Sequence, residues 1–184
     1  MHENPANNPS LPGTPSSSDT ETAAKEREQF LSLLSSFDEA MLVTLRDDTS
    51  LHARPMRIAR AGSGGDLWFA TAIESQKVEE VRTTESCAVT LQRPRAFLTI
   101  SGLAEVVRDR ELIAEMWQES WRLWFPEGPN GASLCLIHVV PEHAEYWDNT
   151  GIKAWRFMLG AAFAALRGRT PEAAGPELHG KVAL

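Results

Sequence analysis

The sequence is short of positive charge, of cysteine and of long apolar runs, and each shortage excludes a class of protein. Its 184 residues carry 18 Lys and Arg against 25 Asp and Glu. This net charge of -7 argues against a protein that coats nucleic acid, because neutralising phosphates needs an excess of basic side chains. The most apolar late stretch, residues 154–166, is too short to cross a bilayer and contains Arg156. Residues 1–18 lack the basic start and apolar centre of a secretory signal, so we expect a cytoplasmic protein without membrane or nucleic-acid partners.

Several chemical motifs are also missing. The sequence has no G-x-G-x-x-G or Walker A pattern and no nucleophile elbow, which argues against a doubly wound Rossmann sheet and against a serine hydrolase. The two cysteines, Cys87 and Cys135, lie in separate apolar runs, where buried free thiols are expected rather than a disulfide. Cys135, His138, Glu142 and His143 gather near one strand. They lack the paired spacing of a zinc site, so no metal is expected.

The chain divides into three parts. Residues 1–18, rich in Pro, Ser and Asn, are expected to be a disordered tail. Residues 19–150 are expected to form the folded domain, and residues 151–184 an amphipathic helix over about 153–167 with a tail. Within the domain a first helix runs to about Ser36, its apolar residues at helical spacing, namely Phe30, Leu33, Leu34 and Phe37. Alternating and β-branched segments predict strands over residues 41–46, 50–60, 66–71, 87–92, 96–108 and 133–148, and further helices are expected over 75–84 and 110–125.

Strands joined mostly by short turns predict a mainly β domain with peripheral helices (α+β). The expected architecture is a closed or half-closed barrel of six or so antiparallel strands. In the 50–60 strand Arg54 and Met56 lie on the side opposite Pro55, and Pro55 marks an edge position or a bulge because it lacks an N–H group. Gly102 suits a bend or a close backbone approach. The strand with Arg54 precedes the 66–71 strand across a short hairpin, so these two strands are expected to pair.

The junction LWFATAIESQK, between a predicted strand and the next helix, carries the clearest chemistry. Thr71, Ser75 and Lys77 lie at or just before the helix N-terminus, where free N–H groups and the helix dipole favour an anion. Arg54, on the strand expected to pair with this one, brings a guanidinium within reach of the same anion. The sequence therefore predicts a phosphate site. The plainer alternative is that Ser75 only caps the helix, Lys77 is solvated and Arg54 pairs with a surface carboxylate.

Two further patterns are expected to be structural. Trp117, Trp121 and Trp124 lie on one stripe of the helix predicted over residues 110–125. This spacing is typical of core or dimer-interface residues, and the alternative is a lid on a flat aromatic ligand. The acidic pair Glu79 and Glu80 is typical of a solvated helix face.

A set of segments resembles one known family in order and spacing. The segments are MLVTL, ARPM, LWFAT, SQK, SG-AEVV-DR, W-x-x-WFPEG and AEYWD. Together they resemble the general stress protein 26 group of the pyridoxamine 5′-phosphate oxidase-like, FMN-binding split-barrel superfamily, over about residues 25–175. The resemblance implies a split β-barrel that forms a homodimer with two flavin mononucleotide (FMN) sites at its interface. The authentic oxidases carry a C-terminal R-L-x-P motif, whereas this chain ends in GPELHGKVAL, so vitamin B6 oxidation is not expected.

The resemblance also implies which residues bind the cofactor. One group holds the phosphate and the ribityl chain: Arg54, Thr71, Ser75, Gln76 and Lys77. The backbone of a second group lines the flavin ring: Pro55, Met56, Phe69 and Ala70. An aromatic residue of the partner chain, Trp121 or Trp124, closes the site, and no catalytic residue is identified.

Three functions stay open at this point. The first is an FMN-dependent oxidoreductase of unknown substrate, in which the flavin supplies the redox chemistry and the protein positions it. The second is a non-catalytic stress protein that holds or senses flavin, with the tryptophan segment covering the ring. The third is a member of the superfamily that binds the deazaflavin F420 or haem, for which His52 or His138 would be the axial ligand.

Overall fold

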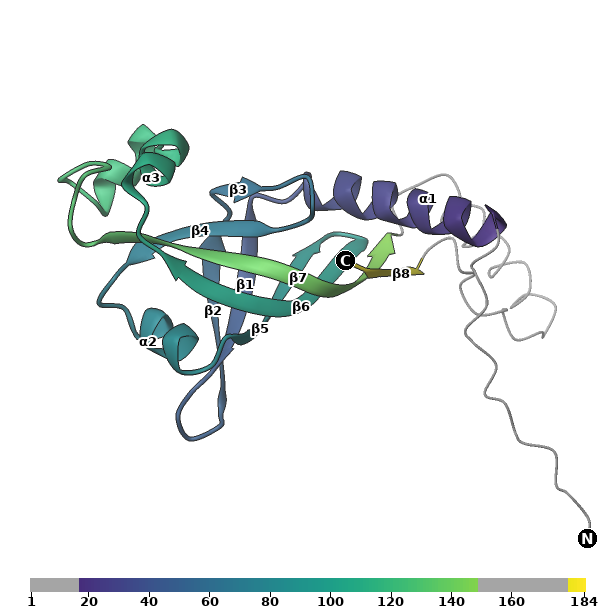
Figure 1. The fold of residues 1–184 in the computed structure, drawn as a ribbon, viewed down its shortest axis with the longest axis horizontal. Helices are drawn as coiled ribbons and strands as arrows, with labels where there is room; N and C mark the ends of the chain where they lie inside the picture. Colours follow the sequence, from purple (N-terminus) through teal and green to yellow (C-terminus); the bar gives the residue numbers. More distant parts are fainter. Residues whose placement is uncertain (1–16, 149–178) are drawn as a thin grey trace, which may run out of the picture.

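The computed structural model describes residues 17–148 and 179–184, which form one antiparallel β-sheet with helices around it (Figure 1). In chain order the elements are α1 (Ser17–Leu34), β1 (Glu39–Leu45), β2 (Leu51–Arg57), β3 (Arg60–Ala61), β4 (Leu67–Ala72), α2 (Gln76–Thr83), β5 (Ser86–Arg93), β6 (Ala96–Val107), α3 (Arg110–Met116), the 3-10 helix η1 (Glu119–Leu123), β7 (Leu134–Asp148) and β8 (His179–Ala183). The predicted tail over residues 1–16 and the helix predicted over 153–167 lie outside the described residues. Residues 17–18 and 179–183, expected in the two tails, belong to α1 and β8.

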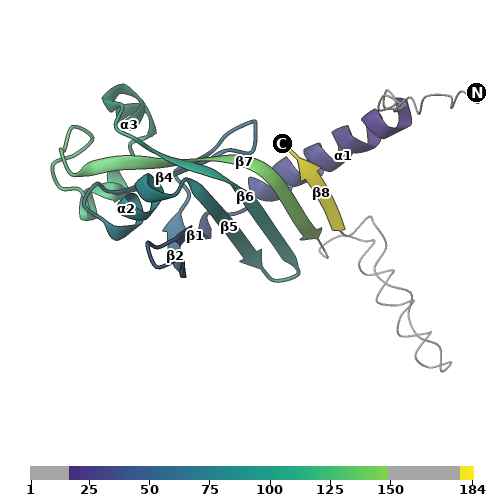
Figure 2. The ribbon, with the colours of Figure 1, turned by 60° about the horizontal axis from the view of Figure 1, so that its bottom comes forward.

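The strands follow the order β2-β1-β5-β6-β7-β4-β3, and β8 pairs with the second half of β7. The sheet curls around an interior, as the turned view in Figure 2 shows. Buried residues alternate with more exposed ones along β1, β4, β5 and β6, so one face of each strand points into that interior. The predicted split barrel is confirmed with all six predicted strands, and β3 and β8 are additions that the sequence did not predict.

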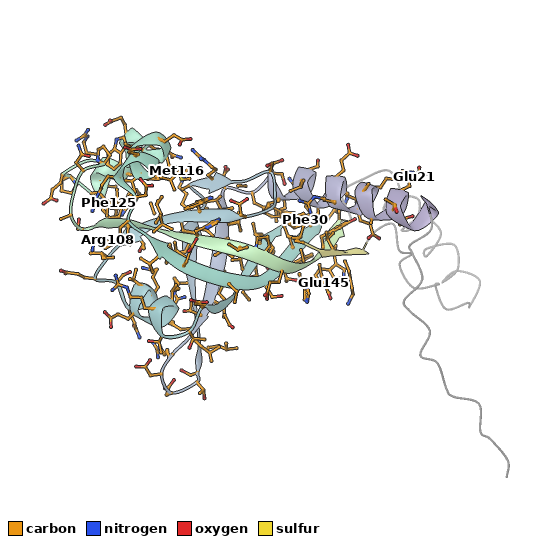
Figure 3. The ribbon with its side chains drawn as sticks, viewed as in Figure 1. Glu21, Phe30, Arg108, Met116, Phe125 and Glu145 are labelled. Carbon is orange, nitrogen blue, oxygen red and sulfur yellow. The ribbon has the colours of Figure 1, made fainter. Side chains whose placement is uncertain are left out.

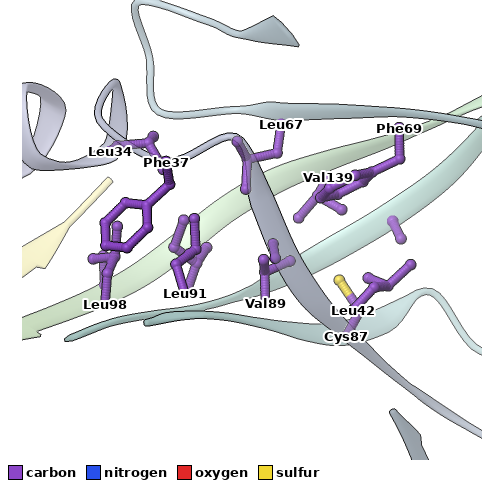
Figure 4. Close-up of a cluster of buried hydrophobic side chains, with 14 of the residues drawn as sticks. Leu34, Phe37, Leu42, Leu67, Phe69, Cys87, Val89, Leu91, Leu98 and Val139 are labelled. Carbon is purple, nitrogen blue, oxygen red and sulfur yellow. The ribbon is translucent and has the colours of Figure 1, made fainter. Parts of the chain in front are cut away.

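The interior of the barrel is apolar, and α1 closes one of its ends. Phe30, Leu33 and Leu34 of α1 are buried, as their helical spacing predicted. Figure 4 shows Leu34, with Phe37 just after the helix, among inward-facing side chains of the sheet, which include Leu42, Leu67, Phe69, Val89, Leu91, Leu98 and Val139. Burying one such Leu or Phe fully contributes about 1.5–3 kcal/mol. Cys87 and Cys135 are buried free thiols, as predicted.

The helix α2 closes the other end of the barrel, away from α1 (Figures 1 and 2). Its inner face buries Val78, Glu80 and Val81, while Glu79 is exposed. The expectation of a solvated Glu79–Glu80 face is therefore wrong for Glu80, whose exposed fraction is 4%. Glu80 is buried because polar partners on β1 and β2 receive its carboxylate, as described below.

The strand β2 does not pair with β4, contrary to the prediction from the short connection between them. It pairs with β1, while the two-residue strand β3 pairs with β4. The Ile58 amide donates to the Asp38 carbonyl next to β1, and the Ala59 amide donates to the Trp68 carbonyl of β4, both at 2.8 Å. The chain thus crosses from one edge of the sheet to the other at residues 58–59. No backbone pairing joins the described strands β2 and β4, so the barrel is split between them. Pro55 lies on β2, an edge strand, as predicted.

The helix predicted over residues 110–125 is divided in two. Asp109 caps its start as predicted, but α3 ends at Met116 because Trp117 and Gln118 are extended, each with ψ 133°. The chain then turns into η1. Trp121 packs with Met116 and other apolar residues on the outer face of the sheet, and this tertiary packing overrides local helical propensity. The predicted tryptophan stripe is therefore wrong.

Gly102 lies where β6 and β7 shift register, between the pairs Ser101–His143 and Gly102–Pro141. A Cβ atom on Gly102 would lie only 2.1 Å from the carbonyl oxygen of Val140. The predicted close approach of two backbones is confirmed, and it requires glycine at this position.

Candidate functional site

A cavity of about 520 Å³ opens at the split between β2 and β4, within the rough range of 300–1,000 Å³ for small-molecule sites. One wall comes from β2 and the other from β4. Lys77 of α2 and aromatic side chains from η1 and the residues after it complete it. The lining residues are Pro55, Met56, Arg57, Ala70, Thr71, Ala72, Lys77, Trp121, Trp124 and Phe125.

Polar groups gather where β4 leads into α2. The Lys77 ammonium donates to the Thr71 hydroxyl at 3.1 Å, and the Thr71 and Ser75 hydroxyl oxygens lie 3.3 Å apart. Ser75 occupies the N-cap position of α2 with extended backbone, but its side chain makes no capping hydrogen bond. The first amides of α2 therefore keep their capacity to bind an anion.

Lys77 faces this cavity beside the hydroxyls, and Arg57 is a second cation in the lining. Burial lowers the pKa of Lys77, and the positive charge of Arg54 lowers it further. Both effects disfavour the charged ammonium. An anion bound beside Lys77 would reverse the effect of Arg54, so the local electrostatics favour a negatively charged ligand.

Arg54 is bound by acceptors inside the end of the barrel that α2 closes. Its Nη1 donates to the Thr44 hydroxyl at 2.6 Å and to the Leu42 carbonyl at 3.3 Å, and its Nη2 donates to Glu80 Oε2. The guanidinium is not among the groups that line the cavity. Its position follows from the alternation of β2, because Arg54 and Met56 point inward, on the side opposite Pro55.

The carboxylate of Glu80 is the centre of this polar cluster. It accepts from Thr44 Oγ1 at 2.6 Å, from Arg54, and it contacts His52 Nδ1 at 2.9 Å. Burial raises the pKa of Glu80, but the hydrogen bonds of Thr44 and His52 and the charge of Arg54 outweigh burial and hold the pKa at about 2. Glu80 is therefore ionised throughout the physiological range.

The aromatic side of the cavity comes from the segment after α3. Trp121 is buried, with its ring edge-to-face with Trp117 at a centroid distance of 5.8 Å. The amides of Trp124 and Phe125 both donate to the Trp121 carbonyl at 2.9 Å, which places their side chains beside the cavity. Phe125 lies near α3, far from Phe30 on α1 (Figure 3). Trp124 is 66% exposed, so it presents a large apolar surface at the rim.

The structure brings together many of the cofactor-binding residues predicted from the resemblance. Those that line the cavity are Pro55, Met56, Ala70, Thr71 and Lys77. Trp121 and Trp124, one of which was expected to reach the site from a partner chain, line the cavity of their own chain. Ser75 is outside the lining, with its hydroxyl next to that of Thr71, and Arg54 belongs to the hydrogen-bonded cluster around Glu80. The Phe69 side chain is in the core, and Gln76 lines a separate cavity of about 630 Å³ with Glu79 and Glu80. Because its side chain is buried in the core, Phe69 has only its backbone available to contact a ligand in the cavity.

Sequence reasoning missed several residues of the site. Arg57, Ala72 and Phe125 line the cavity. Arg57 directly follows the segment ARPM, whereas Ala72 and Phe125 lie inside the segments LWFATAIESQK and W-x-x-WFPEG without having been predicted as site residues. The partners of Glu80 were also missed, because a buried carboxylate gives no local signal on a charged helix. His52, one haem candidate, contacts Glu80, and His138, the other, stacks on Trp68 at 3.7 Å and bonds Glu105. Neither histidine lines the cavity.

Two searches over the described part of the chain bear on other classes of site. No group of three or more His, Cys, Asp or Glu within residues 17–148 and 179–184 has the arrangement to hold a metal ion. No helix in these same ranges has the length and apolar character needed to cross a membrane.

Comparison with known proteins gives matches over most of the chain. The family described as pyridoxamine 5′-phosphate oxidase like matches residues 25–172. The protein bli-3 of Neurospora crassa is 28% identical over 157 residues, which cover 78% of this chain and 75% of that protein. A solved structure described as general stress protein 26 of Jannaschia sp. CCS1 has the same fold, with a TM-score of 0.66, 22% identity and coverage of 88% of this chain and 99% of that one. The general stress FMN/FAD binding protein of Xanthomonas citri has a TM-score of 0.59 and 25% identity, with coverage of 70% and 92%.

Proposed function

The chain belongs to the pyridoxamine 5′-phosphate oxidase-like family, as its motifs predicted, and from this membership we propose that the cavity between β2 and β4 binds FMN. The observation that carries the proposal is the composition of the cavity. Lys77 and Thr71, next to the start of α2, suit a phosphate, and apolar and aromatic residues suit a flat ring. The flavin named for the Xanthomonas citri protein agrees with such a ligand.

The phosphate end of the site consists of Lys77, Thr71, Ser75 and the first amides of α2. Arg54 adds positive charge close enough to lower the pKa of Lys77. Charge-assisted hydrogen bonds contribute about 1.5–3 kcal/mol each, so the phosphate supplies a large share of the affinity for FMN. The backbone around Pro55 and Met56 and the Trp121–Trp124 segment contact the ring.

The site is shared with a second copy of the chain in this proposal. Large apolar side chains stay exposed on the outer face of the sheet, from β2 across β1 and β6 to β7: Leu51, Met41, Phe97, Leu103 and Val140. A partner chain that covered these exposed side chains would remove apolar surface from water, which favours association. Trp124, exposed at the rim of the cavity, is the residue that a partner chain would meet or cover first.

The bound flavin would supply redox chemistry, and the role proposed for the protein is that of an FMN-dependent oxidoreductase acting on a small molecule. The residues of this chain bind the phosphate, orient the ring and exclude water from one side of it. The cavity has an exposed rim at Trp124, which leaves room for a substrate in each chain. A protein that only holds or senses flavin is the alternative, and absence of turnover with NAD(P)H and common electron acceptors would favour it.

The first experiment is an absorbance titration of the purified protein with FMN, together with its mass in solution. We expect one FMN per chain on a dimer, and weaker binding of riboflavin, which lacks the phosphate. Lys77→Ala combined with Arg54→Ala should weaken FMN binding by at least about tenfold. Lys181→Ala is the matched control, because Lys181 lies on β8 and pairs with Glu145 away from the cavity.

Each outcome of this titration has a separate meaning. Unchanged FMN affinity in the folded double variant would refute the phosphate site. Binding of FMN by a monomer with undiminished affinity would refute the shared site. Failure to bind FMN, with binding of the deazaflavin F420 instead, would change the cofactor and keep the cavity.

A further inference from the structure

The polar cluster around Glu80 links α2, which carries Lys77, to β2, which forms one wall of the cavity. Glu80 lies on α2, one helical turn after Lys77, while its partners Thr44 and Arg54 lie on β1 and β2. From this arrangement we infer that Glu80 is a positioning residue, whose carboxylate holds α2, and with it Lys77, at a fixed place relative to β2. The inference rests on the proposed binding of FMN phosphate by Lys77.

The need for such a link follows from the topology. No backbone pairing joins the described strands β2 and β4, so the sheet itself does not fix the width of the split. The Glu80 carboxylate spans it from the α2 side, with contacts to His52 and Arg54 on β2. The same strand carries Pro55 and Met56 into the cavity wall.

The contacts of Glu80 are suited to a fixed geometry. Oε2 receives Thr44 at 2.6 Å and Arg54, and Oε1 lies 2.9 Å from His52 Nδ1 and 3.5 Å from Arg46 Nε. Thr44 also accepts from Arg54, so three residues form a closed ring of hydrogen bonds. A ring of hydrogen bonds around a buried carboxylate holds these side chains in one arrangement.

Charge and positioning predict opposite effects when Glu80 is neutralised. Removing a negative charge near a phosphate site should tighten the binding of an anion, because it raises the local positive potential. It would also free Arg54 to turn toward the ligand. Loss of the fixed geometry should instead weaken binding, because Lys77 and the first amides of α2 would no longer be held for the phosphate. The sign of the effect therefore distinguishes a positioning residue from a mere counter-charge.

The test compares the affinities of Glu80→Gln for FMN and for riboflavin. We expect the ratio of the two affinities, which isolates the phosphate, to fall by about tenfold, with a much smaller change for riboflavin. The matched control is Glu79→Gln, which removes the same charge from the exposed side of the same helix. It should leave the ratio unchanged or slightly raise it.

The remaining outcomes separate this inference from the proposed function. One possible result is that the ratio of FMN affinity to riboflavin affinity is unchanged or larger in Glu80→Gln but falls in Lys77→Ala. This result overturns the positioning role of Glu80 and keeps the phosphate site. Equal affinities for FMN and riboflavin in the unmodified protein overturn the phosphate site itself. If Glu80→Gln does not fold, His52→Ala decides. His52 is partly exposed and contacts the same carboxylate, so its loss should lower the ratio at least about twofold, and an unchanged ratio refutes the inference.

Discussion

Replacing Glu80 by glutamine is expected to remove a pH-dependent part of the free energy of unfolding. In the folded protein the pKa of Glu80 is lowered from 4.5 to about 2, although burial alone would raise it. A carboxyl group with a lowered pKa stabilises the folded state at pH values above its ordinary pKa. That stabilisation is lost as the pH falls from about 4.5 toward about 2.

The size of this contribution follows from the two pKa values. A difference of about 2.5 units, at about 1.36 kcal/mol per unit, corresponds to about 3 kcal/mol. Because the Glu80 side chain is 5% exposed and that of Arg54 is 12% exposed, solvent screens this pair only weakly. The cost of removing one member of a buried ion pair, about 3–5 kcal/mol, is of the same size, since Arg54 is left without its counter-charge.

The assay is urea unfolding of the unmodified protein and of Glu80→Gln at pH values from about 7 down to about 3. The difference in free energy of unfolding between the two should be constant above about pH 5 and shrink by up to about 1.4 kcal/mol per pH unit below about pH 4.5. Between about pH 4.5 and about pH 3 Glu80 becomes protonated in the unfolded chain while it stays ionised in the folded protein, and this uptake of a proton on unfolding reduces the difference. A difference that stays constant down to about pH 3 would refute the reasoning, and Glu79→Gln should show no comparable dependence.

Two further variants test the fold and the rim of the cavity. Gly102→Ala should lower the free energy of unfolding by about 1–3 kcal/mol, since its Cβ would meet the Val140 carbonyl at 2.1 Å. Gly64→Ala, whose Cβ has an ordinary contact at 3.5 Å, is the control, and equal stability of the two variants would contradict the expectation. Trp124→Ala should weaken FMN binding at least about threefold while changing stability by less than about 0.5 kcal/mol. Leu123→Ala, exposed but outside the cavity lining, should do neither, and an equal effect on binding would show that the surface as a whole, not Trp124, is responsible.

The elements that the sequence predicted best are those with a strong local pattern. The spacing of Phe30, Leu33 and Leu34 marks one face of α1, and alternation marks the strands, because burial on one side of an element repeats with its own period. The close backbone approach at Gly102 was also predictable locally, because a glycine inside a long strand has few other uses. Local chemistry also placed Thr71 and Lys77 together at the start of α2.

The pairing of β2 and the place of Arg54 were not predictable from local pattern. A short connection normally indicates a hairpin, but residues 58–59 carry the chain to the opposite edge of the sheet. Arg54 therefore points into the end of the barrel, and the residue that receives it, Glu80, lies 26 positions later. Nothing in the run QKVEEV distinguishes Glu80 from Glu79, because the difference comes from partners on other strands.

A buried carboxylate next to a proposed phosphate site is consistent with the charge balance of this region. Arg54 and Lys77, together with Arg57 in the cavity lining, carry three positive charges, and Glu80 carries one negative charge, which leaves a surplus of two. A phosphate monoester carries about -1.5 to -2 at neutral pH, so it would match this surplus. Without Glu80 the empty site would hold Arg54 and Lys77 close together with no anion between them, and their repulsion would oppose folding. The other acidic residues near α2 line the second cavity, where solvent and salt screen their charges. Glu80 thus stabilises the cationic site when it is empty and still leaves the charge that a phosphate needs.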